Sequence, residues 1–554
     1  MKKNPQQSFF FPGSQRFSPE EKRVKVTPQT KTLRFYLHLR REGDSLSELA
    51  RKVAAGEIPA LEADAIVAQC GSVQQDVLDK VTQTLSDAGF TVGEFDPLTC
   101  LLSAEGNARL VRKYFGATLN EYEGADGFIF TGRNGQLSIP KSWRLNKFVQ
   151  AVHGIDQRPK CEPRLVRFIE PKQPSDDPKP AAGDDKPAKD DNGRDEPRDQ
   201  LARSWNAKAV AEHYGVPLNS LGAGRAVGFV SLGGGLDPKV VAKANARIGV
   251  AAPKITIITV DGATNSPTGD LDGADGENYL DSQIQAAIVP AAEQIMCIGP
   301  NSVTGFANAL LAIAKHKSKP KKISISWGAR EDGEWTNDDR DLFDQALQTC
   351  VAMGITVFCA AGDDGSTDGA SDGKSHCDYP GSSPWNTSCS GVFDNGTTVK
   401  AWNSSFGGAT GGGVSRKYPN YTVDQLVLQA SGIKLPVHSD TGMEGRVVGD
   451  VAGIADPSTG IEVMGPGGHV SVIGGTSAVS PFHAAACVAL ESELGKAVGN
   501  INTLVYKLAA DGKNVCVPVT KGNNGAYSCK DGDIFNAVCG LGPIDYVKFF
   551  AALK

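Results

Sequence analysis

The sequence predicts an α/β protein in which a large three-layer domain with a parallel central sheet follows a smaller α+β domain. After about residue 204, near-continuous apolar runs alternate with helical patterns, which is typical of a parallel sheet covered by helices on both faces. A chain of 554 residues is also too long for one ordinary domain. A stretch at 171–200 that is rich in Pro, Asp and Lys marks the clearest boundary.

Four segments follow from these patterns. We expect a disordered N-terminus at 1–30, a compact α+β domain at 31–165, a disordered acidic and Pro-rich linker at 166–203, and the main domain at 204–554. The linker cannot bury enough apolar surface to offset its ordering entropy. It should therefore be extended and open to proteases.

The smaller domain is expected to lay its helices on one face of an antiparallel sheet. Its patterns are a strand at 31–41, a helix at 73–90, two short strands at 91–106, and a helix followed by a strand at 107–123. The main domain has strand patterns at 225–235, 254–262, 293–300, 321–328 and 354–365, and helical patterns at 238–249, 278–292, 304–316 and 339–354. In such sheets, function gathers beyond the carboxyl ends of the strands.

Composition and local motifs exclude several classes of protein. The net charge of −6 and a pI near 5.9 predict neither a nucleic-acid partner nor an anionic membrane partner. No stretch approaches the roughly 18 apolar residues of a membrane span, and the N-terminus shows no signal-peptide core. The eight histidines lack metal-ligand spacing, 270–278 lacks the alternate acids of an EF-hand, and 407–415 lacks the Lys-Ser/Thr of a phosphate loop.

The twelve cysteines include no C-x-x-C pair, which argues against a zinc or thioredoxin-like site. Most are expected to be buried thiols. The alternative is a small disulfide loop between Cys377 and Cys389, or between Cys516 and Cys529.

Three places carry residues suited to catalysis. Glu277 and Asp281 lie four apart in a helical pattern, so both carboxylates project from one face and should share a proton. Ser477 follows two glycines and Thr476 at a turn into a helix, where its hydroxyl could be exposed. Asp363 ends a buried strand and, if neutral, could donate to a developing oxyanion. The plainer alternatives are a solvated helix face, a helix cap and a solvated turn.

In combination, these motifs resemble the sedolisin–kumamolisin family of serine-carboxyl peptidases. The family motifs are matched at 261–281, at the Ser-Trp-Gly strand 323–335, at 360–369, at the glycine-rich strand 411–419, at 449–463 and at 474–485. The resemblance covers 204–554 nearly throughout, and 31–165 resembles the family's activation domain. It implies a subtilisin-like fold for the main domain.

The resemblance also implies roles for the candidate residues. Ser477 would be the nucleophile, Glu277 the general base, and Asp281 the residue that orients and couples to Glu277. Protonated Asp363 would stabilise the oxyanion beside the Ser477 backbone N–H. A carboxylate base and a neutral oxyanion-hole acid both require an acidic medium, so an acid optimum is expected.

The resemblance further implies a set of residues around the substrate. Ser326, Trp327 and Gly328 would pair with the substrate backbone as an added strand, and Gly411 and Gly412 belong to the glycine-rich strand of the cleft. Asp378 matches an acidic cleft position and could favour basic side chains.

Two departures from the family pattern stand out. Ser231 replaces a glutamate that extends the carboxylate network in some members, whereas Trp335 matches a tryptophan near that network. At the family's calcium site, Pro518 and Asn536 stand where acidic ligands belong, so we expect weak or absent calcium binding. A disulfide between Cys516 and Cys529 could hold this loop in place of the metal. The chemistry itself is expected to need no cofactor.

We therefore expect an acid-acting endopeptidase made as a monomeric zymogen, with peptide or protein substrates. Residues 1 to about 165 would help folding and block the cleft, and the enzyme would cut its own linker. The resemblance implies action outside the cell, reached by an unknown export route after synthesis in the cytoplasm. A tripeptidyl-peptidase and a silent homologue that acts as a binding protein stay open. A His-dependent subtilisin is disfavoured because no His-Gly-Thr motif occurs.

Overall fold

The computed structural model describes residues 7–124, 127–168, 204–404 and 407–554. The central sheet has the order β13–β14–β12–β15–β17–β19–β20, with β23 also paired to β19. Its pairs are parallel except that of β19 with β20. The strands are β12 (Ala226–Ser231), β13 (Lys254–Thr259), β14 (Glu293–Ile298), β15 (Lys322–Ile325), β17 (Thr356–Ala360), β19 (Thr387–Asp394), β20 (Val399–Ala401) and β23 (Val451–Ile454).

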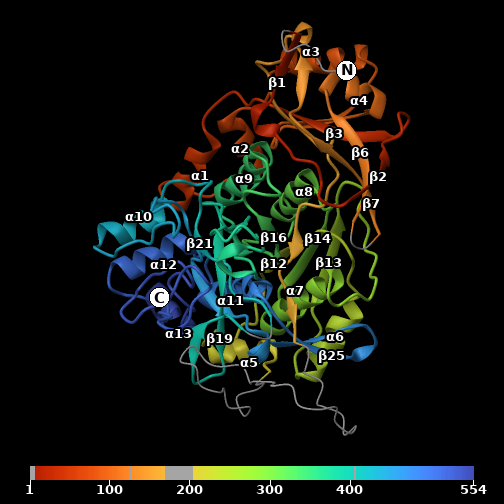
Figure 1. Ribbon diagram of the computed structural model, residues 1–554. Helices are drawn as coiled ribbons and strands as arrows, with labels where there is room; N and C mark the ends of the chain where they lie inside the picture. Colours follow the sequence, from red (N-terminus) through yellow and green to blue (C-terminus); the bar gives the residue numbers. More distant parts are fainter. Residues whose placement is uncertain (1–6, 125–126, 169–203, 405–406) are drawn as a thin grey trace, which may run out of the picture.

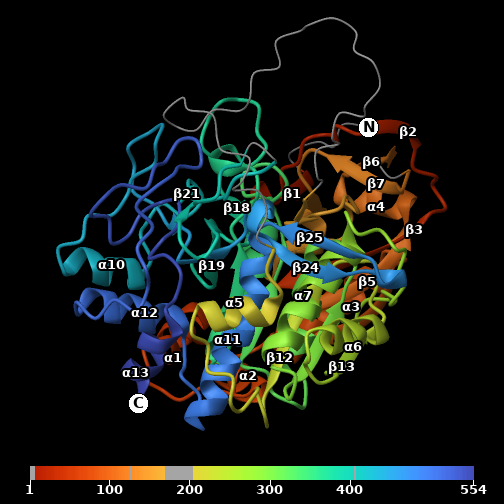
Figure 2. The ribbon, with the colours of Figure 1, turned by 90° about the horizontal axis from the view of Figure 1, so that it is seen from below.

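Helices cover both faces of this sheet and make three layers (Figure 1). Val227 and Phe229 of β12 enter one core and Val230 the other, because successive side chains of a strand point to opposite faces. The first core contains α7 (Ala274–Ile288) and α11 (Val479–Leu494), and the second contains α8 (Val303–Ala314) and α9 (Asn337–Ala352). Figure 2 shows α7 and α11 side by side. The predicted fold class is confirmed, and each strand and helix predicted between 225 and 365 is present.

Shorter elements surround the central sheet of the main domain. A hairpin leads into the turn of Ser477, and a short strand follows β15 directly. These elements are α5 (Ala207–His213), α6 (Pro238–Arg247), β16 (Trp327–Arg330), β18 (Asp378–Tyr379), β21 (Gly413–Val414), α10 (Val423–Ala430), β22 (Val447–Val448), β24 (Ile461–Met464), β25 (Val470–Gly474), the 3-10 turn η8 (Thr476–Ala478), α12 (Ile501–Ala510) and α13 (Tyr546–Leu553).

The N-terminal domain is α+β, as predicted. Its main sheet is antiparallel with the order β4–β5–β3–β9, and a second sheet has the order β2–β6–β7. Phe35, Phe90 and Phe115 pack with ring centroids 5.0–5.7 Å apart in its core. The elements are β1 (Ser8–Phe10), β2 (Lys22–Val26), β3 (Thr32–Leu39), α1 (Leu46–Ala54), α2 (Ala63–Cys70), α3 (Gln75–Asp87), β4 (Thr91–Asp96), β5 (Leu101–Asn107), α4 (Ala108–Phe115), β6 (Thr118–Glu123), β7 (Ile129–Asn134), β8 (Ser138–Pro140) and β9 (Val149–His153).

The expectation of a disordered N-terminus at 1–30 is wrong for residues 7–30. β1 pairs with β8, β2 pairs with β6, and Phe11 is buried in the core of the N-terminal domain. The charged sequence conceals this order because the stabilising contacts are long-range in the chain. Arg16, for example, lies 2.6 Å from Asp339 of α9.

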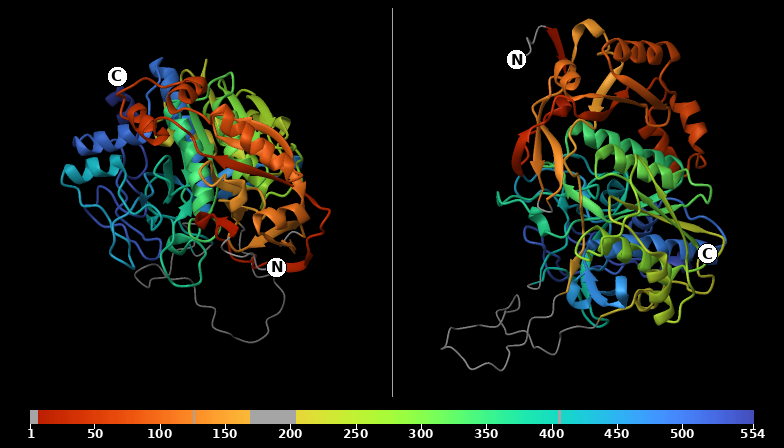
Figure 3. Two further views of the ribbon diagram at one scale, coloured as in Figure 1. Left: turned by 90° about the horizontal axis from the view of Figure 1, so that it is seen from above. Right: turned by 90° about the vertical axis from the view of Figure 1, so that its right-hand side faces the viewer.

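The N-terminal domain is seated on α8 and α9, as the right-hand view of Figure 3 shows (red and orange on green). Leu46, Leu49 and Ile66 of α1 and α2 enter the same hydrophobic core as α9. The two domains therefore share buried apolar surface, which favours their staying together.

The chain does not leave the main domain at residue 165. Residues 160–168 run along it, where β10 (Glu162–Pro163) pairs with β16 and β11 (Val166–Arg167) pairs with β25. The predicted linker thus begins with described residues 166–168, of which Val166–Arg167 form β11, since their backbone finds partners in the main domain. The rest of the linker, 169–203, lies outside the described residues.

All twelve cysteines are buried and unpaired. Neither alternative disulfide forms, including the Cys516–Cys529 staple. The Cys529 thiol instead lies 3.6 Å from the Asn536 Oδ1 atom. Within the described ranges, no helix combines the length and apolar character that crossing a bilayer requires.

Candidate active site

The turn at Ser477 and one face of α7 meet in the interior of the main domain. Glu277 and Asp281 both project from α7 and are fully buried, as is Ser477. Gly475 has φ 101°, a backbone conformation that favours glycine, and it turns β25 into η8 so that Ser477 faces α7. A solvated helix face is therefore wrong for Glu277 and Asp281, and the Ser477 hydroxyl bonds Glu277 rather than capping α11.

Hydrogen bonds join the hydroxyl groups and carboxylates of this cluster. Ser477 Oγ donates to Glu277 Oε2 at 2.8 Å. Ser326 Oγ donates to Asp281 Oδ1 at 2.6 Å and lies 3.1 Å from Ser480 Oγ. Among the described residues, Glu277 Oε1 and Asp281 Oδ2 have no hydrogen-bond partner. The side chain of Ser326 thus belongs to the carboxylate network, and Ser480 is a member that sequence reasoning missed.

Burial raises the pKa of both carboxyl groups on α7 well above the usual range. The charge of Asp281 raises the pKa of Glu277 further, whereas the hydrogen bond from Ser477 opposes the shift. Two like charges this close do not both ionise readily, so the pair holds a proton under acidic conditions.

Asp363 follows β17 and lies on the other side of Ser477. Its Oδ1 accepts from Thr476 N at 2.8 Å and from Thr476 Oγ1 at 2.8 Å. Its Oδ2 has no hydrogen-bond partner in the part of the chain that the structure describes. Burial raises the pKa of Asp363 to about 7. Below that pH the carboxyl group is neutral and can donate a hydrogen bond through Oδ2. The role of Thr476, which fixes Asp363, was not apparent from the sequence.

A segment of the N-terminal part occupies the cleft in an extended conformation. Glu162 lies opposite Gly328 and Pro163 opposite Trp327 in an antiparallel pair. The backbone N–H of Arg164 donates to Ser326 O at 3.0 Å. The predicted strand of Ser326, Trp327 and Gly328 therefore does pair with a chain in the cleft, and here that chain is the protein's own.

Acidic side chains surround Arg164 within the cleft. Its guanidinium forms an ion pair with Asp378 and lies 3.4 Å from Asp364 and 3.8 Å from Asp368. Burial raises the pKa of Asp378 well above the usual range, and the Arg164 charge opposes this shift. Asp378, which was predicted to favour basic side chains, contacts Arg164 of the chain itself, whereas Asp364 and Asp368 were not predicted for this pocket.

Gly411 and Gly412 support the loop of Asp363. Gly411 N donates to Gly362 O at 2.7 Å, and a Cβ on Gly411 would overlap the Ala361 carbonyl. Gly412 is similarly close to the backbone of Ala537. In this structure Gly411 and Gly412 thus contact other residues of the main domain, although they were predicted to line the substrate cleft.

Ser231 and Trp335, the two positions predicted near the carboxylate network, make different kinds of contact. Ser231 Oγ donates to Gly233 O at 2.8 Å, so it closes a turn at the end of β12. Trp335 is buried against Phe306, Phe343 and Tyr379, and the Lys160 ammonium lies 5.3 Å from its ring centre. The indole N–H of Trp335 finds no hydrogen-bond acceptor within the described ranges. These contacts do not join Ser231 or Trp335 to the hydrogen-bonded network, which runs from Asp281 through Ser326 to Ser480.

The residues at the expected calcium position do not fit a calcium ion. Asn536 Nδ2 donates to Val519 O at 3.1 Å, and Asn536 Oδ1 accepts from Cys539 N at 2.8 Å. Pro518 offers no side-chain oxygen. The Val519 carbonyl, which could have served as a ligand, already accepts the hydrogen bond from Asn536. Across the described ranges, no cluster of three or more His, Cys, Asp or Glu residues is arranged to hold a metal.

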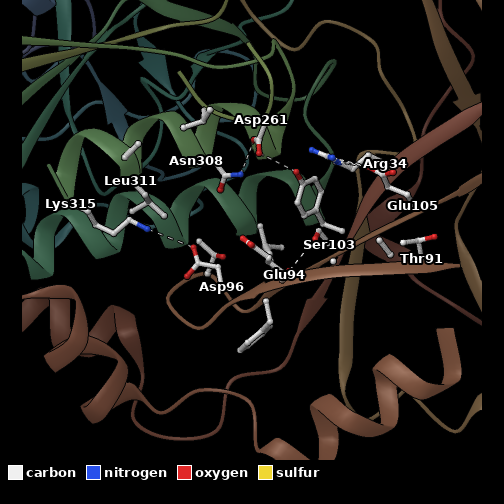
Figure 4. A pocket seen from close by; sticks show the side chains of 18 residues that line it. Arg34, Thr91, Glu94, Asp96, Ser103, Glu105, Asp261, Asn308, Leu311 and Lys315 are labelled. Atoms are coloured by element: carbon white, nitrogen blue, oxygen red, sulfur yellow. Dashed lines mark hydrogen bonds and ion pairs between the residues drawn. The ribbon is translucent and has the colours of Figure 1, made fainter. Parts of the chain in front are cut away.

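A cavity of about 650 Å³ lies between the N-terminal sheet and α8, away from Ser477 (Figure 4). Asp261 accepts from Asn308 at 2.8 Å on one wall, and Lys315 lies 3.9 Å from Asp96 across the gap. The cavity contains no residue of the candidate catalytic cluster and separates the two domains on this side.

Comparison with known proteins gives concordant matches. A model of the pro-kumamolisin activation domain matches residues 20–158. Kumamolisin of Bacillus sp. (strain MN-32) is 35% identical over 500 residues, which are 88% of this chain and 84% of that protein. Tripeptidyl-peptidase sed5 of Aspergillus fumigatus is 28% identical over 278 residues, which are 43% of this chain and 44% of that protein. Among solved structures, Pseudomonas sedolisin, a serine-carboxyl proteinase complexed with pseudo-iodotyrostatin, has a TM-score of 0.54 at 24% identity and covers 63% of this chain and 98% of its own.

Proposed function

The chain belongs to the sedolisin–kumamolisin family of serine-carboxyl peptidases, and from this premise we propose that it is the zymogen of an acid-acting endopeptidase with a Ser477–Glu277–Asp281 triad. Family membership and the activation domain make it a serine-type peptidase made with an intramolecular inhibitory pro-domain. The observation that carries the finer assignment is the 2.8 Å hydrogen bond from Ser477 Oγ to Glu277 Oε2 in a buried site.

This geometry supports acyl transfer through Ser477. Glu277 accepts the hydroxyl proton as Ser477 Oγ attacks a peptide carbonyl, and it returns that proton to the leaving amine. A water molecule then hydrolyses the acyl-enzyme, with Glu277 again taking the proton. Asp281 positions Glu277, and Ser326 in turn holds Asp281 through a 2.6 Å hydrogen bond.

Asp363 would serve the oxyanion. In its neutral form it can donate a hydrogen bond to the developing charge. A preorganised donor of this kind lowers the activation free energy by about 3–4 kcal/mol. The carboxyl group stays neutral below about pH 7, where its pKa lies. An acid optimum thus follows from Asp363 as well as from the carboxylate pair.

The course of the cleft segment favours an endopeptidase over a tripeptidyl-peptidase. The chain enters from β9 through Lys160 and pairs with β16 before it reaches Ser477. More than three residues therefore fit on the acyl side of the nucleophile without a block. Asp378 would take a basic side chain of the substrate, as it takes Arg164 here. We place the mature enzyme in an acidic extracellular medium, as a monomer that needs no cofactor for its chemistry.

The test is to hold the purified chain at about pH 4 and about pH 7.5, which bracket the carboxylate range, and to follow its mass and its cleavage of a peptide library. Ser477→Ala should abolish both self-cleavage and peptide cleavage. Ser492→Ala, a half-buried serine in the last turn of α11, the helix that follows Ser477, is the matched control. An intact, inactive wild-type chain whose Ser477 resists a fluorophosphonate would instead indicate a silent binding homologue.

A further inference from the structure

We propose that the bond this enzyme cuts in its own chain is Arg164–Leu165, ahead of the linker at 169–203 rather than within it. This inference rests on the proposed function, because it assigns a substrate bond to the same nucleophile. Its basis is the segment 160–168, which the structure places across Ser477 with defined partners on both sides.

The carbonyl group of Arg164 is the one presented to the nucleophile. The Ser477 backbone N–H donates to Arg164 O at 2.9 Å. A Cβ on Gly475 would lie 2.4 Å from Arg164 O and 2.6 Å from Asp363 Oδ2, so both oxygens flank the same glycine. The carbonyl oxygen therefore occupies the place where the Ser477 N–H and a neutral Asp363 would stabilise an oxyanion.

The chain is held on the acyl side by backbone and side-chain contacts together. Pairing with β16 and the hydrogen bond from Arg164 N to Ser326 O fix the direction of the strand. The Arg164 side chain is only 9% exposed and points into the pocket of Asp378, Asp368 and Asp364. A buried guanidinium is costly unless it is paired, so this pocket selects an arginine at this position.

The chain is held on the leaving side as well. Val166 and Arg167 pair with Gly474 and Ile473 of β25, and Phe168 N donates to Val472 O at 2.8 Å. The Arg167 guanidinium lies 2.6 Å from Asp272 at the surface. The bond after Arg164 is thus fixed between two antiparallel pairings, as a substrate is before attack.

Other registers are unfavourable for simple reasons. A shift by one residue would turn the neighbouring carbonyl away from Ser477, since successive groups of a strand alternate in direction. A shift by two would place either Glu162 or Val166 in the acidic pocket. The first introduces a like charge among the carboxylates, and the second leaves them without a cation.

The proposed step is an ordinary hydrolysis. Ser477 Oγ bonds to the Arg164 carbonyl carbon, its proton passes to Glu277, and the C–N bond to Leu165 breaks as Glu277 protonates the Leu165 amine. Water then releases Arg164 as a free carboxyl group and restores Ser477. The main domain would keep residues 165–203 as a new N-terminal tail that begins with Leu165.

The experiment uses the full chain, brought to about pH 4. The earliest cleavage product is identified by intact mass and N-terminal sequencing. We expect a new N-terminus that reads Leu-Val-Arg-Phe and a partner fragment that ends at Arg164, and neither should form with Ser477→Ala. Arg164→Ala should slow this cut by about 30-fold or more, because a buried charge pair is lost. Arg34→Ala, the control in the pro-domain, should change the rate by less than about threefold, because its ion pair with Glu105 is exposed and lies away from the cleft.

Other outcomes separate this inference from the proposed function. A Ser477-dependent first cut within 169–203, or an unchanged rate with Arg164→Ala, would overturn the bond assignment and leave the peptidase intact. No Ser477-dependent cleavage of any bond or peptide would overturn both. If Arg164→Ala does not fold, the bond assignment can be tested with a synthetic peptide of residues 160–168 and the active enzyme. It should be cut between Arg and Leu, and the peptide with Arg164→Gln should be cut much more slowly; cleavage elsewhere in it would contradict the assignment.

Discussion

Arg16 Nη2 lies 2.6 Å from Asp339 Oδ2, so the start of the chain is tied to the first turn of α9 by a buried ion pair. Lys160 Nζ lies 2.6 Å from the same oxygen, and His153 Nδ1 lies 3.4 Å from Oδ1. One carboxylate of the peptidase domain thus holds three basic side chains of the pro-domain. Burial opposes ionisation of Asp339, but the charges of Arg16 and His153 hold its pKa below the usual range.

Asp339→Asn should therefore weaken pro-domain docking at neutral pH. It leaves Lys160 buried without its carboxylate partner and Arg16 with the more distant Asp156, 3.6 Å away, and breaking a buried ion pair costs about 3–5 kcal/mol. The measurement is hydrogen exchange of β3 and β9 at pH 7 in the Ser477→Ala chain, where self-cleavage cannot interfere. Glu123→Gln, which breaks an exposed pair with Lys22, is the control and should have little effect. Equal protection in the two variants would show that the Asp339 cluster does not hold the domains together.

His38 is predicted to act as an acid trigger, a role that Asp339 cannot have. Because the pKa of Asp339 is depressed, its docking contribution is present above about pH 4 and fades only at lower pH. His38 is fully buried beneath α9 and lies 3.3 Å from Gln345 Oε1, with the His153 ring 5.8 Å away. Burial, and then the nearby charges of His153, Arg41 and Arg40, lower its pKa to about 3.

A released pro-domain would protonate His38 near its ordinary pKa of about 6.5, while the docked one would not. Docking should thus lose about 1.4 kcal/mol per pH unit as the pH falls from about 6.5 toward 3. His38→Gln should flatten the pH dependence of pro-domain release across this window, measured by hydrogen exchange of β3 in the Ser477→Ala chain. His469→Gln, an exposed histidine in the β24–β25 turn, should keep the wild-type profile. An unchanged profile in His38→Gln would exclude this residue as the trigger.

Much of this arrangement was predictable because it is local. The positions of Glu277 and Asp281 follow from helix periodicity, and Ser477 and Asp363 follow from turn and strand-end patterns together with the family resemblance. Trp327 and Gly328 pair with a peptide strand as expected. The remainder depends on contacts between distant residues. No local pattern places Arg16 against Asp339 or Arg164 against Asp378, so the order at 7–30 and the chain in the cleft appear only in the folded structure.

Two substitutions of Asp363 should show whether catalysis depends on a hydrogen-bond donor at this position or on the titrating carboxyl group itself. Its neutral form is the useful one, so activity should fall as the pH rises through about 7, the pKa of this group. Asp363→Ala removes the donor and should lower kcat by about 10²–10³-fold. Asp363→Asn keeps an oxygen for Thr476 and an amide donor in place of Oδ2, so it should retain more activity and extend it to higher pH. The measurement is the kcat–pH profile of the activated variants. Equal losses in Asn and Ala would contradict the donor role.

Calcium should not stabilise this protein. Asn536 bonds the Val519 carbonyl and the Cys539 N–H, which closes the loop with side-chain and backbone hydrogen bonds alone. A hard cation needs several oxygen ligands, and Pro518 and Asn536 bring no charge to the site. A ligand that binds only the folded state raises the melting temperature with its concentration. We therefore expect the same Tm in millimolar calcium and in excess chelator. Asn536→Ala should lower Tm in both conditions alike, because it breaks the loop's own hydrogen bonds, whereas a Tm that rises with calcium only in the wild type would show that Asn536 is a ligand after all.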